Sequence, residues 1–358
     1  MSKVLMKGNE AFAEAAIRAG CKCYFGYPIT PQNEIPEYMS HELPKAGGAF
    51  LQAESELAAV NMAFGAAASG GRVFLSTSSP GLALMQEGLG FICSTEVPVV
   101  VLNVSRGGPG VGGIQPGQAD YIQVTRGGYN GDAKIPVLAP SGIQECVDLI
   151  YEAFDIADKY RNPVLIFADG MMGQMMEPVE LPEPRGITTV ERLPQEKPWA
   201  ITGTGQHPGR NVVYSLRMEP DVLEKHVEHM FEKYDAAAKE LVRYKTQGLE
   251  DAEIVFVAFG TMSRLCAEAM ELLGEQGVKA GLIRPISLWP FPDAAFDEIG
   301  PKTKLVISTE LSMGQMIFDV RAAARGRWPV ELINRTGGIV PSSVEIVERA
   351  MKLLEGVK

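Results

Sequence analysis

Short apolar runs alternate with longer amphipathic or Ala-rich segments over the first half of the chain. Apolar strands that alternate with crossover helices form parallel sheets, so residues 1–178 are predicted to be one α/β unit. Because the strands are apolar on both faces, helices should cover both sides of the sheet. The strands are predicted at 73–76, 97–104 and 162–169, and helices at 9–20 and 141–160.

The pattern changes near residue 178. Residues 179–251 are predicted to be a Pro-rich connection followed by a charged helix, because six prolines fall between positions 178 and 208 amid polar residues. A second α/β alternation then fills residues 252–358. Its strands are predicted at 252–261, 278–285, 304–310 and 330–334, and its helices at 262–277 and 342–357.

Composition is that of an ordinary globular protein, with 46% apolar and 22% charged residues. The net charge of −11 comes from interspersed charges of both signs, which argues against a nucleic-acid-binding surface. The sequence has no run of eighteen apolar residues that would span a membrane, and its first residues are too short and polar for a signal peptide. A cytoplasmic location is therefore predicted.

The cysteines and histidines do not form a recognisable metal site. Five cysteines are an odd number without C-x₂-C spacing, which favours reduced thiols over disulfides, zinc ligands or an iron–sulfur cluster. His226 and His229 fall on one helical face, but no third ligand accompanies them, so an exposed charged helix is favoured. The cysteines are Cys21, Cys23, Cys93, Cys146 and Cys266.

A glycine-rich stretch at 107–113 contains the residue pattern of a dinucleotide-binding motif. Residues 108–113 read G-x-G-x-x-G after a predicted strand, but Pro116 and Gly117 disfavour the helix that must follow. A loop that a ligand approaches is the better interpretation. The sequence also contains neither a P-loop motif nor a G-x-S-x-G motif.

A more informative segment spans residues 52–70. Two glutamates, Glu54 and Glu56, precede a helix whose positions 57–68 carry only one polar side chain, Asn61, so this helix is predicted to be buried nearly all round. Glutamates in a first turn stabilise the helix dipole and need no other role. The residues alone leave both interpretations open, a dipole partner or a functional carboxylate.

The stretch GYPITP at 26–31 is unusually stiff. Proline fixes its own φ and restricts the residue before it, so Pro28 and Pro31 should hold Ile29 and Thr30 extended. Such a loop loses little conformational entropy when a ligand binds.

These motifs together resemble a known family. Glu56, Ala58, Ala59 and Gly65 are similar to the pyrimidine-binding segment of thiamine-diphosphate enzymes. GYPITP, with Glu56 following Thr30 by 26 residues, resembles the α subunit of 2-oxoacid:ferredoxin oxidoreductases. The resemblance covers almost the whole chain, including STSSPGLALMQEGLG, Ser105-Arg106 and GGPGVGGIQPGQADY. Residues 252–358 resemble the C-terminal domain of the transketolase group.

The resemblance implies roles for the matching residues. Glu56 would hold N1′ of the aminopyrimidine and promote the tautomer that deprotonates the thiazolium; Glu54 is the competing candidate. Pro28 and Gly65 would contact the cofactor. Thr30 and Ile29 would contact the substrate. Arg106 would bind the 2-oxoacid carboxylate, for which a guanidinium is well shaped, with a surface arginine as the alternative.

The chain lacks the diphosphate half of such a site. The family's magnesium motif is G-D-G followed by Asn, and only imperfect matches occur, at Gly131-Asp132-Ala133 with Asn162 and at Asp169-Gly170. The resemblance therefore implies a hetero-oligomer that is inactive without its partners. A β subunit would supply the diphosphate and Mg²⁺ site. Partner iron–sulfur clusters, and a ferredoxin-like subunit or free ferredoxin, would accept electrons.

The function that the resemblance implies is oxidative decarboxylation of a 2-oxoacid with CoA to acyl-CoA, CO₂ and reduced ferredoxin. YPITPQNEIPEYM and GGIQPGQADY look most like subunits for branched-chain 2-oxoacids such as 2-oxoisovalerate. A 2-oxoglutarate enzyme is the alternative and would need a further cation, for which Arg126 is one candidate. Two other classes stay open: a stand-alone transketolase-type thiamine enzyme and a non-catalytic assembly subunit.

Overall fold

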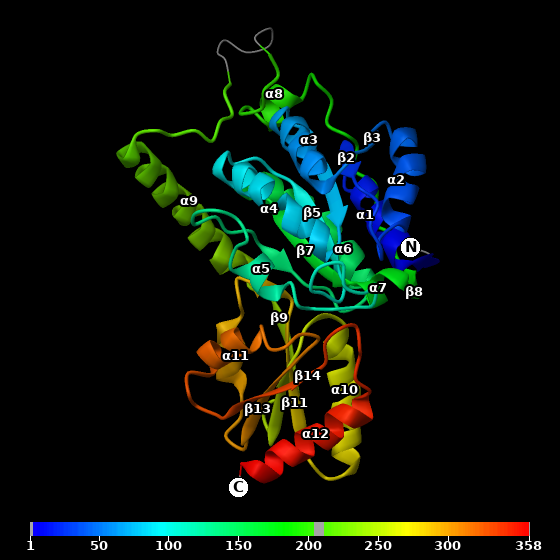
Figure 1. The fold of residues 1–358 in the computed structure, drawn as a ribbon, viewed down its shortest axis with the longest axis vertical. Coiled ribbons are helices and arrows are strands. Elements are labelled where there is room, and N and C mark those ends of the chain that lie inside the picture. Colours follow the sequence, from blue (N-terminus) through cyan, green and yellow to red (C-terminus); the bar gives the residue numbers. More distant parts are fainter. Residues whose placement is uncertain (1–2, 204–210, 358) are drawn as a thin grey trace.

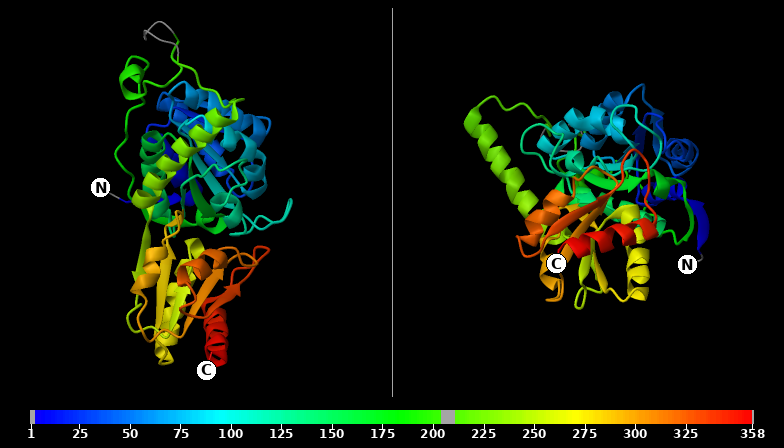
Figure 2. Two further views of the ribbon diagram at one scale, coloured as in Figure 1. Left: turned by 90° about the vertical axis from the view of Figure 1, so that its left-hand side faces the viewer. Right: turned by 60° about the horizontal axis from the view of Figure 1, so that its bottom comes forward.

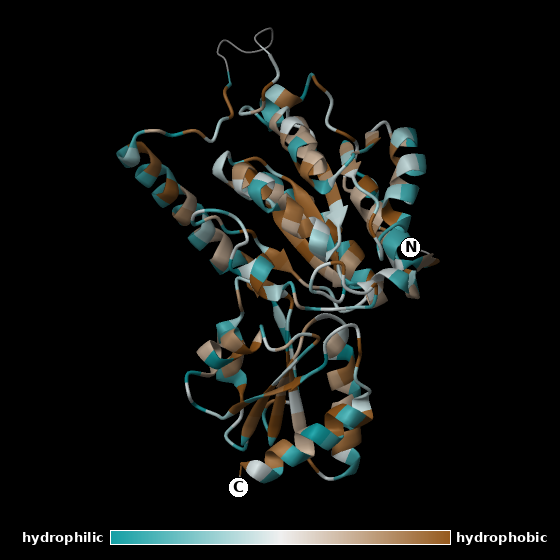
Figure 3. Ribbon diagram, in the orientation of Figure 1, coloured by the Kyte–Doolittle hydropathy of each residue, from teal (hydrophilic) through white to brown (hydrophobic). Residues whose placement is uncertain are grey.

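The computed structural model describes residues 3–203 and 211–357. Within these residues the chain forms two α/β units, which Figure 1 shows one above the other and Figure 2 shows from two further sides. Pro208 of the predicted connection lies outside the described residues. In both sheets the strands carry most of the hydrophobic colour (Figure 3), as expected for strands covered by helices.

The first unit is built on a seven-stranded sheet of order β12-β6-β7-β5-β4-β2-β3. All pairs are parallel except that of β12 with β6. The sequence predicted three of these strands within two or three residues. The strands are β2 (Cys23–Gly26), β3 (Ala49–Gln52), β4 (Val73–Thr77), β5 (Val100–Ser105), β6 (Val137–Leu138), β7 (Val164–Asp169) and β12 (Ser287–Trp289).

Helices cover both faces of this sheet. Alternate residues of one strand enter different cores: Val100 and Leu102 of β5 pack with the first set of helices, and Val101 packs with the second. The first set comprises α1 (Gly8–Arg18), α2 (Glu34–Lys45), α6 (Ile143–Tyr160) and α7 (Gly170–Gln174). The second comprises α3 (Glu56–Ala68), α4 (Ser79–Ser94) and α5 (Tyr121–Thr125).

The order of the strands creates a topological switch point. β2 lies between β3 and β4, so the chain leaves β2 toward one side of the sheet and later returns on the other side. In open parallel sheets, ligands bind outside the carboxyl ends of the strands at such a point. The loop after β2, which contains GYPITP, and the start of α4 after β4 both lie there.

The second unit has a five-stranded sheet of order β14-β13-β10-β11-β9, parallel except for the edge strand β9. Predicted and observed strands and helices agree here as well. The elements are β9 (Tyr244–Gln247), β10 (Ile254–Val257), β11 (Ala280–Pro285), β13 (Leu305–Glu310), β14 (Val330–Asn334), a 3₁₀ helix η1 (Asp293–Glu298), α10 (Gly260–Glu275), α11 (Ile317–Ala324) and α12 (Ser343–Gly356).

Two short strands cross the boundary that the sequence predicts at residues 251 and 252. β9 precedes that boundary and pairs with β11 of the second sheet. β12 follows β11 in the chain but returns to pair with β6 at the edge of the first sheet. The chain thus passes between the units more than once, which ties them together through main-chain hydrogen bonds.

The connection between the units runs along the first unit. Residues that precede it form a two-stranded antiparallel sheet of β1 (Val4–Lys7) and β8 (Met176–Val179). The connection then contains α8 (Leu193–Glu196) and α9 (Pro220–Leu241). Met230 and Tyr234 of α9 are buried in the core that includes α3 and α4. The predicted charged helix therefore packs on the first unit along one side.

Helix α3 departs from the prediction of burial all round. Leu57 and Met62 are 47% and 36% exposed, and Asn61 and Gly65 are exposed on the same side of the helix. On α4, which packs beside α3, Leu84 is 54% exposed. The prediction was wrong because an apolar composition does not tell whether a helix is buried within its own chain or presented to another molecule.

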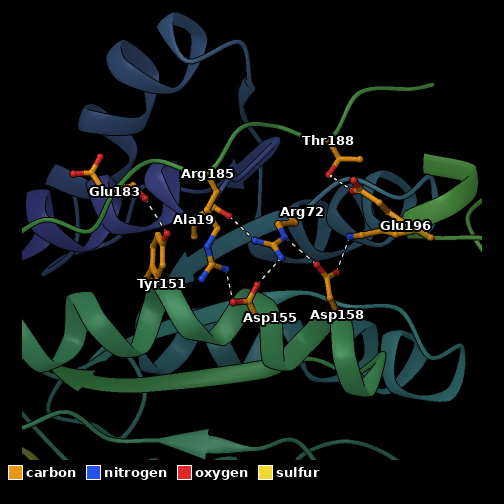
Figure 4. Close-up of polar contacts among 10 residues, drawn as sticks. Ala19, Arg72, Tyr151, Asp155, Asp158, Glu183, Arg185, Thr188 and Glu196 are labelled. Carbon is orange, nitrogen blue, oxygen red and sulfur yellow. Dashed lines mark hydrogen bonds and ion pairs between the residues drawn. The ribbon is translucent and has the colours of Figure 1, made fainter. Parts of the chain in front are cut away.

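A network of charges around Arg72 fastens the connection to α6 (Figure 4). Arg72 donates to Asp158 at 2.9 Å, to Asp155 at 2.7 Å and to the carbonyl of Ala19 at 2.7 Å. Arg185, from the connection, shares Asp155, and Lys197 donates to Asp158 at 2.6 Å. Arg72 thus joins the end of α1 to α6, and the two aspartates that it binds on α6 also hold Arg185 and Lys197 of the connection.

We predict that Arg72→Met lowers the free energy of unfolding by about 1–3 kcal/mol, because it removes three hydrogen bonds of a charged group and leaves two carboxylates near each other. Urea unfolding followed by circular dichroism measures this loss. Arg192→Met is the matched control, since Arg192 is 71% exposed and pairs with Glu196 one helical turn away. It should cost less than about 0.5 kcal/mol; equal losses for the two variants would contradict the role of the Arg72 network.

Candidate active site

The carboxyl ends of β2, β4, β5 and β7 bring four segments of the chain to one edge of the first sheet. Strand β4 holds the loop after β2: the hydroxyl of Ser76 donates to the side chain of Gln32 at 2.6 Å. The same hydroxyl contacts the hydroxyl of Tyr24 at 2.7 Å. Asn9 of α1 and Gln174 of α7 both donate to the carbonyl of Pro31, at 2.8 and 2.9 Å. The predicted stiff loop is therefore held at both of its sides.

Glu56 occupies the first position of α3 and is only 5% exposed, whereas Glu54 is exposed. Ser55 caps the helix by accepting from the N–H of Ala58 at 3.1 Å, which turns Glu56 inward. Its carboxylate lies against the first turn of α4: a Cβ atom placed on Gly81 would stand 2.4 Å from Glu56 Oε1. Among the described residues, no side chain or backbone group donates a hydrogen bond to this carboxylate, and no cation pairs with it.

Arg106 follows β5 and is 9% exposed. Its Nη1 donates to the carbonyl of Thr30 at 2.8 Å and its Nη2 to the carbonyl of Val111 at 2.8 Å. Its Nε is buried without a partner, and no carboxylate of the described chain forms an ion pair with it. A guanidinium has five N–H donors, so three of them remain for another group.

The side chain of Asp120 links the start of α4 to strand β5. Its Oδ2 accepts hydrogen bonds from Ser79 at 2.6 Å, Ser105 at 2.8 Å and Asn103 at 2.8 Å. Ser79 begins α4, and its hydroxyl also accepts from the N–H of Arg106 at 3.0 Å. The first turn of α4 therefore contacts Arg106 at Ser79 and Glu56 at Gly81. One oxygen of this buried carboxylate therefore has three donors from its own chain, whereas no such donor contacts the carboxylate of Glu56 among the described residues.

A cavity of about 510 Å³ opens beside Thr30. Ile114, Met171 and Met175 form its apolar walls, together with Pro31 and Pro116, and no lysine or arginine of the described chain lines it. Its polar edge is formed by side chains of Asn33, Glu34, Gln115 and Gln174. The carboxylate of Glu34 forms an ion pair with the ammonium group of Lys7, 2.5 Å away.

The structure brings some of the predicted site residues together and separates others. Thr30 and Arg106 are in direct contact, and Ile29 belongs to the same loop, where its carbonyl accepts from the N–H of Gln32 at 3.0 Å. Pro28 is exposed at the start of that loop. Gly65 lies nine residues beyond Glu56, roughly 13 Å along the axis of α3, so the two do not touch. Their proposed contacts with a cofactor remain predictions.

Several residues that shape this edge escaped the sequence analysis: Ser79, Gly81, Gln118 and Asp120. Asp120 stood within the quoted motif GGIQPGQADY as its only charged residue, and Gly81 followed a Ser-Ser-Pro sequence typical of a helix start. These were the available signals. Their roles depend on partners far away in the sequence, which a single sequence does not reveal.

The imperfect magnesium motifs do not form metal sites within the described chain. Asn162 donates to the carbonyl of Lys134 at 2.9 Å, and Asp169 caps α7 by accepting from the N–H groups of Met171 and Met172 at 3.0 and 3.1 Å. His226 contacts the carbonyl of Ser94 at 2.8 Å, and desolvation lowers its pKa. In residues 3–203 and 211–357, no group of three or more potential ligands is arranged around a metal position.

Two further expectations can be compared with the described residues. All five cysteines are free thiols, and burial raises the pKa of Cys93 to about 12 and that of Cys266 to about 12, which makes both poor nucleophiles. Within the described chain, none of the helices has the length and apolarity needed to cross a lipid bilayer.

The fold and the matching family model together define a thiamine-diphosphate-binding domain. Residues 14–246 match the pyruvate flavodoxin/ferredoxin oxidoreductase family, thiamine-diphosphate-binding region, and residues 252–346 match core domain II of pyruvate:ferredoxin oxidoreductase. The chain therefore belongs to the 2-oxoacid:ferredoxin oxidoreductase family. The predicted family and the predicted fold class are confirmed.

The chain is also similar to individual proteins of this family. The ketoisovalerate oxidoreductase subunit VorB of Methanothermobacter marburgensis is 46% identical over 94% of this chain and 94% of its own. The 2-oxoglutarate synthase subunit KorA of Methanocaldococcus jannaschii is 37% identical over 98% of this chain and all of its own. The 2-oxoglutarate:ferredoxin oxidoreductase of Magnetococcus marinus, with 2-oxoglutarate, coenzyme A and succinyl-CoA bound, superposes with a TM-score of 0.87 at 27% identity; this chain spans 65% of that longer chain.

The residues at the switch point fit the aminopyrimidine half of the cofactor. Thr77 Oγ1 faces the same position on Gly81 as the carboxylate of Glu56, and Thr77 Oγ1 and the neighbouring Ser78 Oγ are buried without hydrogen-bond partners in the described chain. Buried polar atoms normally have partners, so this group of atoms indicates a polar ligand that completes the site. The described residues contain no group of three or more His, Cys, Asp or Glu side chains arranged to hold the metal ion of a diphosphate.

Asp169 provides a test of the electrostatics at this edge. Burial raises its pKa, while hydrogen bonds from Thr261, Met172 and Met171 oppose the rise. A carboxyl group whose pKa is higher in the folded state stabilises the fold at pH values below about 3.9, the unfolded pKa, and that contribution is lost as the pH rises through the folded pKa. We predict that Asp169→Asn, which keeps an acceptor for the helix cap, gains stability relative to the wild type as pH rises from 4 to 7.

Urea unfolding midpoints of both proteins across this pH range measure the difference. Asp169→Ala is the control, because it also removes the acceptor for the Met171 and Met172 N–H groups and should cost about 0.5–2 kcal/mol at every pH. If Asp169→Asn is destabilised as much as Asp169→Ala, the ionised carboxylate itself holds the cap and the interpretation is wrong.

Proposed function

We propose that this chain is the subunit of a 2-oxoacid:ferredoxin oxidoreductase that binds the aminopyrimidine of thiamine diphosphate through Glu56 and the substrate carboxylate through Arg106. The complete complex would convert a branched-chain 2-oxoacid such as 2-oxoisovalerate, CoA and oxidised ferredoxin into an acyl-CoA, CO₂ and reduced ferredoxin. The observation that carries this proposal is the presence of two buried charges of opposite sign, both without a charged partner in the described chain, at one switch point.

Electrostatics supports an anionic substrate. Transferring a guanidinium from water into a protein interior is costly unless a carboxylate or hydrogen bonds replace the water, and Arg106 has carbonyl partners for only two of its five donors. Its Nε and the remaining Nη protons can bind a planar carboxylate in a bidentate manner. The contact of Arg106 with the Thr30 carbonyl supports a role for the β2 loop in binding the 2-oxoacid.

Glu56 is suited to hold a protonated or N–H-bearing ring nitrogen. Its carboxylate is buried, ordered by the Ser55 cap and by packing against Gly81, and has no donor from its own chain. When bound, thiamine diphosphate supplies the carbon acid and the electron sink for decarboxylation. Glu56 controls the protonation state of the pyrimidine, and the apolar surroundings of α3 and α4 exclude water from that exchange.

The exposed faces of α3 and α4 support a partner that supplies the diphosphate half. Leu57, Met62 and Leu84 present apolar side chains around the helix that begins at Glu56. A Cβ atom on Gly65 would meet nothing within 4 Å, so a partner can approach the backbone closely there. We propose that a β subunit covers this surface and brings the diphosphate and Mg²⁺ site, and that iron–sulfur clusters of partner chains pass electrons to ferredoxin. A cytoplasmic location remains a prediction.

The cavity beside Thr30 favours a branched-chain acid over 2-oxoglutarate. Its apolar walls suit an isopropyl group, and it lacks a cation for a second carboxylate. Arg126, the candidate for that role, is instead occupied: both of its Nη atoms contact Asp319, one of them at 2.9 Å. The 46% identity with a ketoisovalerate oxidoreductase subunit also supports a branched-chain 2-oxoacid as the substrate. 2-Oxoglutarate stays the second candidate because of the 37% identity with a 2-oxoglutarate synthase subunit.

We predict that Glu56→Gln in the reconstituted complex lowers kcat by ~10²-fold or more, because the amide cannot exchange a proton with the pyrimidine. Glu54→Gln is the matched control. It removes the same charge two residues away at an exposed position and should leave kcat unchanged. If Glu56→Gln retains nearly full turnover, the chain is a non-catalytic assembly subunit and the proposal fails.

A second prediction concerns the native complex. Purification followed by mass spectrometry should identify at least one further chain, and CoA-dependent dye reduction should be fastest, in kcat/KM, with 2-oxoisovalerate. 2-Oxoglutarate should be slower by ~10-fold or more, because its second carboxylate would enter an apolar cavity without a counter-ion. The isolated chain should not retain thiamine diphosphate. Tight binding by the isolated chain would instead identify a stand-alone thiamine enzyme, and preference for 2-oxoglutarate would replace the proposed substrate.

A further inference from the structure

The second unit holds the segment that lies beside Arg106. Gln118 is 2% exposed, and its N–H donates to the carbonyl of Leu311 at 2.9 Å while its side-chain oxygen accepts from the N–H of Leu311 at 2.9 Å. Its side-chain nitrogen donates to the carbonyl of Phe259 at 3.0 Å. Phe259 and Leu311 closely follow β10 and β13, so Gln118 is bound to the ends of two central strands of the second sheet.

Neighbouring residues extend this attachment. Gln315 accepts from the N–H of Ile122 at 2.8 Å, and Asp319 accepts from the hydroxyl of Tyr121 at 2.6 Å. Residues 115–122 thus belong by sequence to the first unit, yet Gln118, Tyr121 and Ile122 form hydrogen bonds with the second.

The same segment shapes the backbone around Arg106. Arg106 and Pro116 form an antiparallel bridge, and the N–H of Gly107 donates to the carbonyl of Gln115 at 2.9 Å. A Cβ atom on Gly117 would stand 2.8 Å from the carbonyl oxygen of Arg106, so the two chain segments are already in backbone contact. The position of the Arg106 backbone is therefore set by residues 115–117 on one side and by β5 on the other.

Gly337 and Gly338, in a loop of the second unit, lie against Gly107 and Gln115 of the first unit. A Cβ atom on Gly338 would stand 2.4 Å from Cβ of Gln115, which no real structure tolerates without movement. A Cβ atom on Gly107 would stand 3.1 Å from both the Gly337 carbonyl carbon and the Gly338 nitrogen. Gly337 itself has open space on its Cβ side. Gly338 is thus the point at which the second unit presses against the loop that carries Arg106.

We propose that the second unit positions Arg106 for the substrate carboxylate, and that Gly338 is the positioning residue through its close contact with Gln115. This inference rests on the proposed role of Arg106 in binding the 2-oxoacid. It gives the second unit a part in substrate recognition, although none of its residues needs to touch the substrate. A displaced Arg106 would weaken a contact made both in the ground state and in the transition state, so the KM for the 2-oxoacid should change more than kcat.

The two adjacent glycines provide a matched pair of variants. Both have a positive φ, 67° at Gly337 and 92° at Gly338, so alanine strains the backbone at either position. Only Gly338→Ala also collides with Gln115. We expect Gly338→Ala in the complete complex to raise the KM for 2-oxoisovalerate ~10-fold or more relative to Gly337→Ala, with the KM for CoA and the thermal unfolding midpoint similar in the two variants.

A compensating substitution tests the contact itself. Gln115→Gly removes the Cβ atom with which the new methyl group of Gly338→Ala would collide, so the double variant Gln115→Gly with Gly338→Ala should recover the KM of Gln115→Gly alone. If Gly338→Ala does not assemble, Gly107→Ala crowds the backbone of Gly337 and Gly338 from the first unit at a position without positive φ, and it should raise the same KM. Equal KM values for the two glycine variants, or absence of recovery in the double variant, would overturn the proposal.

Arg106→Gln separates this inference from the proposed function. If that variant leaves the KM for the 2-oxoacid unchanged, Arg106 does not bind the carboxylate and the proposed function fails at this residue. If Arg106→Gln raises the KM strongly but Gly338→Ala does not, Arg106 binds the substrate without help from the second unit, and only the present proposal is wrong.

Discussion

Burying an acidic or basic side chain without an oppositely charged partner is costly, and within the described residues this chain does so with Glu56 and Arg106 at a single edge of its first sheet. The surrounding structure serves to hold these two charges in place. Ser55 caps α3 and turns Glu56 inward, Gly81 leaves room for its carboxylate, and Ser79 binds the backbone of Arg106. Asp120 shows the contrast, because three donors from its own chain satisfy one of its oxygens.

The switch point explains why the two charges can meet. The chain winds away from β2 to one side and returns as β4 on the other, so the loop after β2 and the first turn of α4 face a common crevice. Arg106 reaches this crevice from β5 and contacts the carbonyl of Thr30. The proposed site for a 2-oxoacid depends on this strand order together with the two side chains.

The two units of the chain are joined where the site is formed. β12 returns to the first sheet, Arg284 of β11 binds Glu145 of α6 at 2.7 and 2.8 Å, and Gln118 inserts its amide between the ends of β10 and β13. These contacts make the second unit a support for the loops that surround Arg106.

The sequence by itself determined the alternation of strands and helices, because burial of both sheet faces requires continuous apolar strands and amphipathic helices between them. It also determined the candidates Glu56, Thr30 and Arg106, since their spacing and their neighbours form recognisable motifs. Only the tertiary structure decided that Glu56 rather than Glu54 is buried, that α3 has an exposed apolar face, and that β12 returns to the first sheet. Each of these depends on contacts between residues far apart in the chain, and local hydropathy carries no record of which surface will meet which.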